Sequence, residues 1–265
     1  MHAFHYHRPA SSKDAVSLRS KNEEATYLAG GQSLVQAMKL RLSSPTDLID
    51  LGTIKELAGI KVSGSTVEIG AMTRHADVAA SAEVKKAIPA LAALAAMIGD
   101  RQVRHMGTIG GSLANNDPAA DYPAAALGLG ATITTNKRKI EADKFFTGLY
   151  ETALEPGELI TSVSFPAPKR AAYMKFKNPA SRFAIVGVFV ADFSGKVRVG
   201  VTGAGPSAFR QADMEKALSA KFAPESVANM KVKADGLNND LHASPEYRAH
   251  LVTVMAKRAV EAALK

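Results

Sequence analysis

Two short segments combine paired glycines with small polar side chains, a composition suited to binding a phosphate-bearing ligand. The first is A-G-G-Q-S, residues 29–33, and the second is T-I-G-G-S, residues 108–112. Glycine lets a ligand approach the backbone N–H groups because no Cβ stands in the way, and it tolerates positive φ in tight turns. An apolar strand precedes the first pair and a helical pattern follows it, which is a context in which N–H groups can receive phosphate oxygens. The two segments predict two loops that hold a pyrophosphate from two sides.

The polar side chains around these glycines fit the sugar side of such a ligand. Ser33, Thr108 and Ser112 supply hydroxyl donors without bulk. The amides of Asn115 and Asn116 can bind a ribityl or ribose hydroxyl, and Asp121 could accept from a sugar hydroxyl or a ring N–H. On chemistry alone, the alternative that both segments are simple turns stays open. No dinucleotide-binding G-x-G-x-x-G precedes a helix, and no G-x-x-x-x-G-K-[ST] loop is present.

Other reaction chemistries gain little support from the sequence. Cysteine is absent, which excludes disulfides, thiolate zinc sites and Cys-ligated iron–sulfur clusters on this chain. His2, His5 and His7 alternate with aromatics and have no carboxylate nearby in the sequence, so no metal site is predicted. His105 lies beside the second glycine segment, where positioning that loop or facing solvent is favoured over acid–base work. With no Ser/His/Asp arrangement either, we assign no catalytic residue.

The formal charge of +8 admits nucleic acid, an anionic cofactor or an acidic partner. Nucleic acid is disfavoured because the basic residues are scattered, no reader motif is present and tryptophan is absent. One basic stretch without acids runs from residue 169 to 182 and is either a solvated connector or a functional surface. The N-terminus lacks a signal-peptide pattern and no apolar run reaches the roughly 20 residues of a membrane span. We therefore expect a soluble cytoplasmic protein.

Hydrophobic periodicity predicts an α+β chain with a boundary near residue 168, where Pro166 and Pro168 interrupt a strand pattern. The expected strands are 4–7, 25–29, 47–51, a hairpin over 60–69, 131–135, 159–165, 184–193 and 197–201. The expected helices are 12–21, 34–42, 73–80, 88–98, 213–220, 223–229 and 245–264. A first domain then covers 1–168, in subdomains of about 1–55 and 56–168, and a small α+β domain of antiparallel strands and helices covers 169–265.

At this point the residues carry a family resemblance. The segments A-G-G-Q-S-L-V-Q-A-M-K-L-R-L (29–42) and Q-V-R-H-M-G-T-I-G-G-S-L-A-N-N-D-P-A-A-D (102–121) resemble the two FAD-binding motifs of the medium subunit of molybdenum hydroxylases. That group contains the xanthine dehydrogenases, carbon monoxide dehydrogenases and aldehyde oxidoreductases. The likeness continues through residues 158–166, 175–187 and 201–205, and so covers nearly the whole chain in order.

The resemblance implies a fold and a set of cofactor contacts. The fold is an FAD-binding domain of the vanillyl-alcohol-oxidase (PCMH) type in two α/β subdomains, followed by a smaller C-terminal domain. The backbones of 29–34 and 108–112 would hold the pyrophosphate and adenosine side of FAD, Asn115 and Asp121 the ribityl side, and Leu159 or Ile160 would pack near the rings. The implied cofactor-binding residues are Ala29, Gly30, Gly31, Gln32, Ser33, Leu34, Thr108, Gly110, Gly111, Ser112, Asn115, Asp121, Ile160 and Lys175.

The resemblance also implies a function in electron transfer. A large companion subunit would carry the molybdenum cofactor and the substrate chemistry, and a small one two [2Fe–2S] clusters. Electrons would reach FAD on this chain and leave to an external acceptor, in a dimer of heterotrimers. Arg182-Phe183 stands where many relatives have an acidic residue and then an aromatic, and Gln32 replaces less polar or His residues of some relatives, which leaves the acceptor open.

Two other functions remain as alternatives. A self-sufficient FAD-dependent oxidase or reductase of the same cofactor fold would need its own acid and base near the ring, and the C-terminal part offers no obvious pair. A non-enzymatic binding module would be colourless. The substrate of the complex is not encoded in this chain, since specificity would reside in the large subunit.

Overall fold

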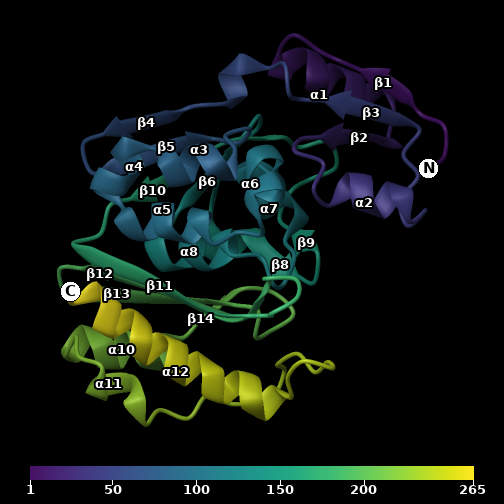
Figure 1. The fold of residues 1–265 in the computed structure, drawn as a ribbon. Helices are drawn as coiled ribbons and strands as arrows, with labels where there is room; N and C mark the ends of the chain where they lie inside the picture. Colours follow the sequence, from purple (N-terminus) through teal and green to yellow (C-terminus); the bar gives the residue numbers. More distant parts are fainter.

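The N-terminal part of the chain is a small parallel sheet with one helix on each side. The computed structural model describes all 265 residues, and this unit appears in purple at the top of Figure 1. It comprises β1 (His5–His7), α1 (Ser12–Lys21), β2 (Ala25–Leu28), α2 (Leu34–Lys39) and β3 (Asp47–Asp50). The strand order is β1-β3-β2, with both pairs parallel. The sheet therefore delivers the first glycine segment, which directly follows β2, to the carboxyl edge of the strands.

The second unit is a five-stranded antiparallel sheet covered by short helices. Its strand order is β4 (Ile60–Ser63), β5 (Thr66–Gly70), β10 (Ile160–Pro166), β6 (Thr132–Thr135) and β7 (Lys139–Glu141). The helical elements between the strands are η1 (Lys55–Leu57), α3 (His75–Ala80), α4 (Ala82–Ala87), α5 (Pro89–Ala96), α6 (Arg101–Met106), α7 (Ile109–Asn115), α8 (Tyr122–Leu129) and α9 (Ala142–Phe145), with a two-stranded hairpin of β8 (Phe146–Gly148) and β9 (Glu151–Thr152). Strand β10 pairs with both β5 and β6, and it thereby joins the strands before and after the helices into one sheet.

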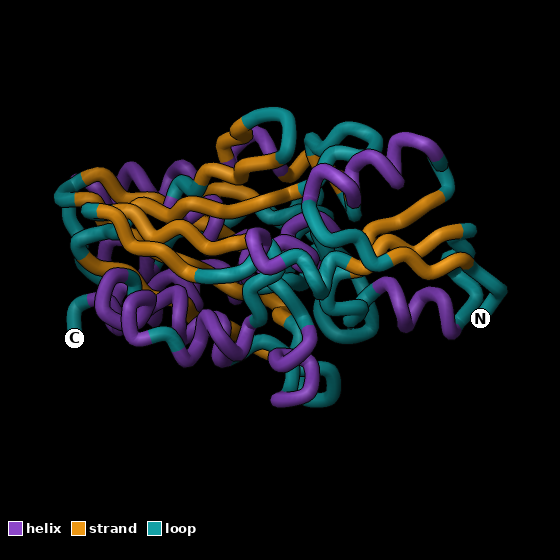
Figure 2. The backbone as a smooth tube through the Cα atoms, turned by 90° about the horizontal axis from the view of Figure 1, so that it is seen from above, coloured by secondary structure: helices purple, strands orange, loops and turns teal.

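The C-terminal part is a four-stranded antiparallel sheet with helices packed on it. The sheet runs β11 (Arg170–Lys177), β12 (Ala184–Phe193), β13 (Lys196–Thr202) and β14 (Phe209–Arg210), and the helices are α10 (Ala212–Ala220), α11 (Glu225–Ala228) and α12 (Pro245–Ala263). Figure 1 shows α8 on one face of this sheet and α10 and α12 on the other, in agreement with their contacts. Seen from above in Figure 2, the N-terminal unit and the C-terminal helices lie toward opposite ends of the molecule.

Three apolar clusters follow this arrangement. The N-terminal cluster is small and is built on residues such as Ala15, Ile49 and Ile54. The largest cluster fills the second unit and also includes Tyr173, Phe189 and Ala191 from the C-terminal sheet, so that sheet is packed directly onto α8. A third cluster lies between the other face of the sheet and α12, around Val188, Val252 and Met255. No helix has the length and apolar composition that a membrane crossing requires.

Most expected elements are present, and the α+β class is confirmed, but four local expectations were wrong. Of the two alternatives for the basic stretch at 169–182, the solvated connector was wrong, because residues 170–177 form strand β11, in which Ala172 and Tyr173 are buried. The second glycine segment is not a loop but the first turn of α7. Helix α2 ends at Lys39 rather than 42, because Arg41 takes φ +59°. Pro166 pairs with Thr66 in the ladder, which proline tolerates because it is the last residue of β10.

Candidate functional site

The two glycine segments, about 80 residues apart in sequence, lie against each other. A Cβ on Gly30 would stand 2.0 Å from the carbonyl oxygen of Met106 and 2.7 Å from Cα of Gly107. A Cβ on Gly111 would lie 3.5 Å from that of Ala29. Gly30 is thus required for the close approach of the first segment to the chain that leads into α7. The fold builds a single site from both segments.

The first segment presents a run of free backbone donors. Gly31 has φ +69°, the left-handed conformation that glycine adopts without strain. The N–H groups of residues 30–34 donate to no acceptor within the chain, and the Ser33 side chain does not cap α2. Free N–H groups around a positive-φ turn form an anion-binding concavity. The backbone is therefore shaped to receive phosphate oxygens.

The second segment begins a helix and does not form the expected loop. Thr108 N-caps α7, and its hydroxyl accepts from the Gly111 N–H at 3.2 Å. The Gly110 N–H donates to the Ala71 carbonyl at 2.8 Å, and a Cβ on Gly110 would come within 2.5 Å of the Cβ of Ala71. Neither glycine has positive φ. Gly110 serves the packing of α7 on the chain after β5. Because the Ile109 and Ser112 N–H groups also donate within the chain, this segment offers small side chains but no free N–H group in the first turn of α7.

The two asparagines at the end of α7 have separate roles. Asn116 is fully buried in the left-handed C-cap position, and its amide donates to the carbonyls of Gly148 and Glu151 at 2.9 and 2.7 Å. It fixes the β8–β9 hairpin and is not available to a ligand. Asn115 is only half-buried, and its side chain makes no hydrogen bond within the chain. Of the pair, Asn115 is the one left free.

Asp121 and Lys175 meet in a buried ion pair that joins the second unit to the C-terminal sheet. Lys175 Nζ lies 2.9 Å from Asp121 Oδ2, and the two side chains are 2% and 5% exposed. The Tyr173 hydroxyl donates to Asp121 Oδ1 at 2.5 Å. Burial raises the pKa of Asp121, against the opposing effect of the Lys175 ammonium and the Tyr173 hydroxyl. The motif residue and the distant lysine thus share one site.

Tyr173 is the member of this group that sequence reasoning missed. It is buried within β11, and Gly187 on β12 leaves it room, since a Cβ there would lie 2.2 Å from the Tyr173 oxygen. Burial, reinforced by the Asp121 charge, raises its pKa well above the ordinary value. Apolar and basic residues alternate only over 174–177, and Tyr173 lies on the same strand face as Lys175 and Lys177, so the local pattern gives no signal for an inward-facing tyrosine.

Ile160, Leu159 and Phe183 differ in burial and in the apolar cluster to which they belong. Ile160 is buried in the core of the second unit, whereas its neighbour Leu159 packs in the N-terminal cluster. Phe183 is 49% exposed beside Arg182, which has φ +63°. Both residues lie at the start of β12, close in sequence to Lys175. The adjacent residues Leu159 and Ile160 thus belong to two different apolar clusters, that of the N-terminal unit and that of the second unit.

His75, His105 and His7 differ in their burial and in the groups they contact. His75 is buried against Gly107, whose added Cβ would lie 2.5 Å from Nε2, and burial with help from Arg104 lowers its pKa to about 4. His105 is exposed. His7 Nε2 lies 2.5 Å from Oδ1 of Asp47, a carboxylate 40 residues away that the sequence around His7 does not show. No cluster of three or more metal-ligating side chains occurs.

These features fit a cofactor with a pyrophosphate and a polyol chain. The unpaired N–H groups at 30–34 lie against the chain that leads into α7, and Asp121, six residues after α7, forms the buried pair with Lys175. Residues 2–168 match the family model described as the FAD binding domain in molybdopterin dehydrogenase. The chain belongs to the medium-subunit family of molybdenum hydroxylases.

Individual relatives share nearly the full length of this medium subunit. It is 36% identical to the carbon monoxide dehydrogenase medium chain of Hydrogenophaga pseudoflava, over 98% of this chain and 96% of that one. It is 35% identical to the nicotine 6-hydroxylase medium subunit of Paenarthrobacter nicotinovorans, over 97% and 96%. Among solved structures, reconstituted CO dehydrogenase from Oligotropha carboxidovorans superposes with a TM-score of 0.90 at 35% identity, covering 98% of this chain and 97% of that one.

The family sets what this chain carries and what it lacks. As a medium subunit it holds an FAD-binding domain and belongs to a family of oxidoreductase subunits. It has no cysteine, so it binds no Cys-ligated iron–sulfur cluster itself. The relatives act on chemically unrelated molecules, so likeness to the medium subunit does not define a substrate.

Proposed function

We propose that this chain is the electron-transfer flavin subunit of its complex, taking electrons from [2Fe–2S] clusters on a small companion subunit and delivering them to an external acceptor. FAD supplies a carrier that exchanges electrons one or two at a time. The protein's part is to bind, orient and shield that cofactor. The observation that carries the proposal is the close approach of the segment with unpaired N–H donors, residues 30–34, to the chain that leads into α7.

Each part of the site has a distinct role toward FAD in this proposal. The backbone of Ala29 to Leu34 binds the pyrophosphate, and the hydroxyl of Ser112 approaches it from the side of α7. Asn115 and Asp121 bind the ribityl side. Ile160 borders the rings. Lys175 supplies a positive charge that Asp121 partly balances. The ammonium group stabilises negative charge that develops on a nearby group of the cofactor.

The assembly around the chain follows from the same reasoning. We place it in a dimer of heterotrimers in the cytoplasm, with 1–168 as the FAD-binding domain, in subdomains of about 1–55 and 56–168, and 169–265 as the C-terminal domain. The exposed basic residues of 169–182 suit contact with the small subunit or the flavin edge. Substrate chemistry takes place on the large subunit, so this chain needs no acid–base pair of its own.

The alternative, a self-sufficient FAD oxidase or reductase, lacks a supporting constellation. Asp121, Tyr173 and Lys175 are buried and bonded to one another. The neighbouring Tyr122 is fully buried, and burial raises the pKa of its hydroxyl far above the range of a general acid or base. The buried His75 has a pKa of about 4 and packs behind Gly107. None of these arrangements offers a free acid and a free base.

Purification of the chain with its companions tests the proposal. The expected sample contains one FAD per copy of this chain, together with one iron-containing and one molybdenum-containing chain. Rapid mixing with the substrate of the complex should reduce the flavin only when the iron–sulfur chain is present. A colourless sample, or a yellow chain that turns over substrate by itself, would refute it.

A further inference from the structure

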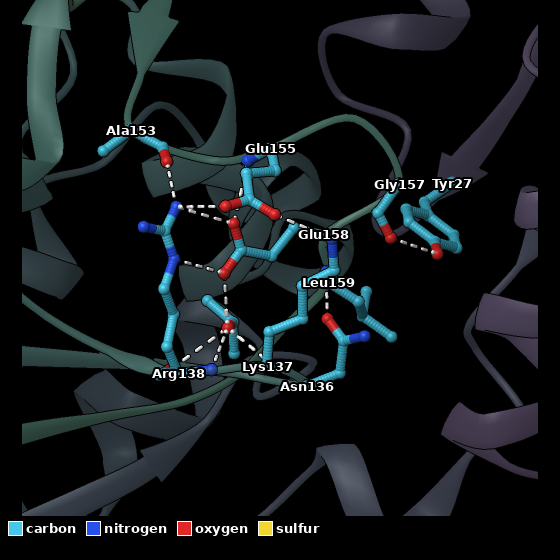
Figure 3. A network of polar contacts seen from close by, with 10 residues as sticks. Tyr27, Asn136, Lys137, Arg138, Ala153, Glu155, Gly157, Glu158 and Leu159 are labelled. Atoms are coloured by element: carbon cyan, nitrogen blue, oxygen red, sulfur yellow. Dashed lines mark hydrogen bonds and ion pairs between the residues drawn. The ribbon is translucent and has the colours of Figure 1, made fainter.

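A network of polar contacts connects the N-terminal unit to the second unit beside the first glycine segment. Figure 3 shows it between the turn after β6 and the chain that leads into β10. At its centre the Glu158 carboxylate, with a side chain that is 0% exposed, faces Arg138. Arg138 Nε and Nη2 donate to its two oxygens, each at 3.1 Å. This is a two-point ion pair, which fixes geometry as well as charge.

The other bonds to Glu158 leave its carboxylate well satisfied. The Thr135 hydroxyl donates at 2.6 Å and the Glu155 backbone N–H at 2.8 Å. Although burial raises it, the bonds from Arg138, Glu155 and Thr135 hold the pKa of Glu158 at about 2. The carboxylate is therefore charged at neutral pH. It holds the bend at 155–158 in one conformation, in which Gly157 has φ +74°.

The residues on both sides of Glu158 contact the N-terminal unit. The carbonyl oxygen of Gly157 accepts from the Tyr27 hydroxyl at 2.9 Å. Leu159 packs in the N-terminal cluster, while its backbone is bonded in both directions to Asn136, at 2.9 and 2.8 Å. Tyr27 belongs to β2, two residues before Ala29. The bend at 155–158 thus contacts the strand that carries the glycine segment.

From this geometry we propose that Glu158, acting through Gly157 and Tyr27, is a positioning residue for the FAD site. The site is divided between two units, with the N–H donors of 30–34 on one and α7 on the other. The Glu158–Arg138 pair belongs to the second unit. The hydrogen bond from the Tyr27 hydroxyl to the Gly157 carbonyl fixes β2 relative to that pair. The network sets the separation of the two halves of the site, and thereby the affinity for FAD, without touching the cofactor. This inference rests on the proposed binding of FAD by residues 29–34.

The test uses the full chain purified with its companion subunits. Tyr27→Phe removes one hydroxyl, and Glu158→Gln removes the charge and places an amide opposite Arg138. We expect each variant to release FAD about five- to tenfold faster than wild type on dilution, in proportion to the loss of one hydrogen bond or ion pair. Glu155→Gln is the matched control, since Glu155 is 51% exposed and lies 3.6 Å from Arg138; it should release FAD like wild type.

A double-mutant cycle separates positioning from general destabilisation. If Glu158 acts through Tyr27, the combined variant should release FAD no faster than the more severe single variant, because one connection is broken in both. Wild-type release rates in both single variants, or effects that add in the double variant, would overturn the inference. Thr135→Val, a milder change at the same carboxylate, should increase the release rate while Thr135→Ser restores it. Wild-type protein without FAD would instead refute the proposed function.

Discussion

Single residues decide whether the two glycine segments can share a site, and Gly30 is the most constrained of them. Its missing side chain lets the backbone of the first segment touch that of Met106 and Gly107. Gly31 is needed for a different reason, its positive φ. Gly110 is needed for a third, its packing on Ala71. Paired glycines that look alike in the sequence thus meet separate steric demands.

Gly30→Ala tests the close approach directly. The new methyl group would meet a backbone carbonyl at 2.0 Å, so either the segment at 29–33 or the end of α6 must move. We expect a loss of about 1–3 kcal/mol in stability, typical of overpacking, and a fall of at least about tenfold in FAD affinity, measured by titration of FAD-free protein. Gly64→Ala is the control for affinity: nothing lies within 4 Å of its added Cβ, and its φ of +58° costs stability without a clash against the first segment. Equal FAD affinity in Gly30→Ala and Gly64→Ala would contradict this role.

His75 gives the fold a pH dependence that originates in one side chain. Burial lowers its pKa from 6.5 to about 4, so the native state holds it neutral. The unfolded chain takes up a proton below about pH 6.5 and the folded chain does not. The stability that the neutral His75 gives the folded state is therefore fully present above pH 6.5 and is lost progressively as the pH falls toward 4.

The free energy of unfolding in urea should show this loss. Between pH 7 and pH 5 we expect wild type to lose about 2 kcal/mol from this residue, by linkage of its two pKa values. His75→Phe, whatever its absolute stability, should show a correspondingly smaller difference between the two pH values. The Glu158 carboxylate does not interfere, since its contribution is lost between about pH 4.5 and 2. An unchanged pH slope in His75→Phe would contradict the assignment.

At the scale of elements, the sequence predicted those whose hydrophobic period is uninterrupted. Strand β12, with an apolar run from Ala184 to Ala191, and α12, opened by the Ser244 cap and Pro245, were both expected. Strand β11 was missed because Lys175 and Lys177 suggested solvent. The Lys175 charge is balanced only by Asp121, which lies 54 residues away. A buried ion pair between distant residues has no signature in local composition.

The geometry around the candidate site could not be predicted from the sequence. Both glycine segments, Asp121 and Lys175 were named as cofactor-binding residues, which stays a prediction, and Tyr173, which bonds to Asp121, was not named. Helix α7 was mistaken for a loop because two glycines are unfavourable inside a helix. They are tolerated where the N-terminal turn packs on Ala71 and Thr108 supplies the cap. Packing on Ala71 outweighed the low helix propensity of glycine. The N–H groups of Gly110 and Gly111, which the sequence had suggested were free, donate to the Ala71 carbonyl and the Thr108 hydroxyl.

At the scale of the whole molecule, the proposed FAD site joins parts of the chain that belong to different apolar clusters. Residues 30–34 extend from the unit with the N-terminal cluster, and α7 belongs to the largest cluster. The cluster under α12 is built from the opposite face of the C-terminal sheet. A ligand at this site stabilises the contact between the first two regions, and α12 has no part in that contact.

Hydrogen exchange with and without FAD should reveal this division. The N–H groups of residues 30–34 have no acceptor within the chain, so they should exchange rapidly in FAD-free protein and slow markedly, by about tenfold or more, when the pyrophosphate accepts from them. Residues 109–115 should slow with them, because ligand binding suppresses the opening of both halves together. Residues 251–260 of α12 should exchange at the same rate in both samples, which makes them the internal control. Protection confined to α7, or spread equally over α12, would show that the first segment does not hold the cofactor as proposed.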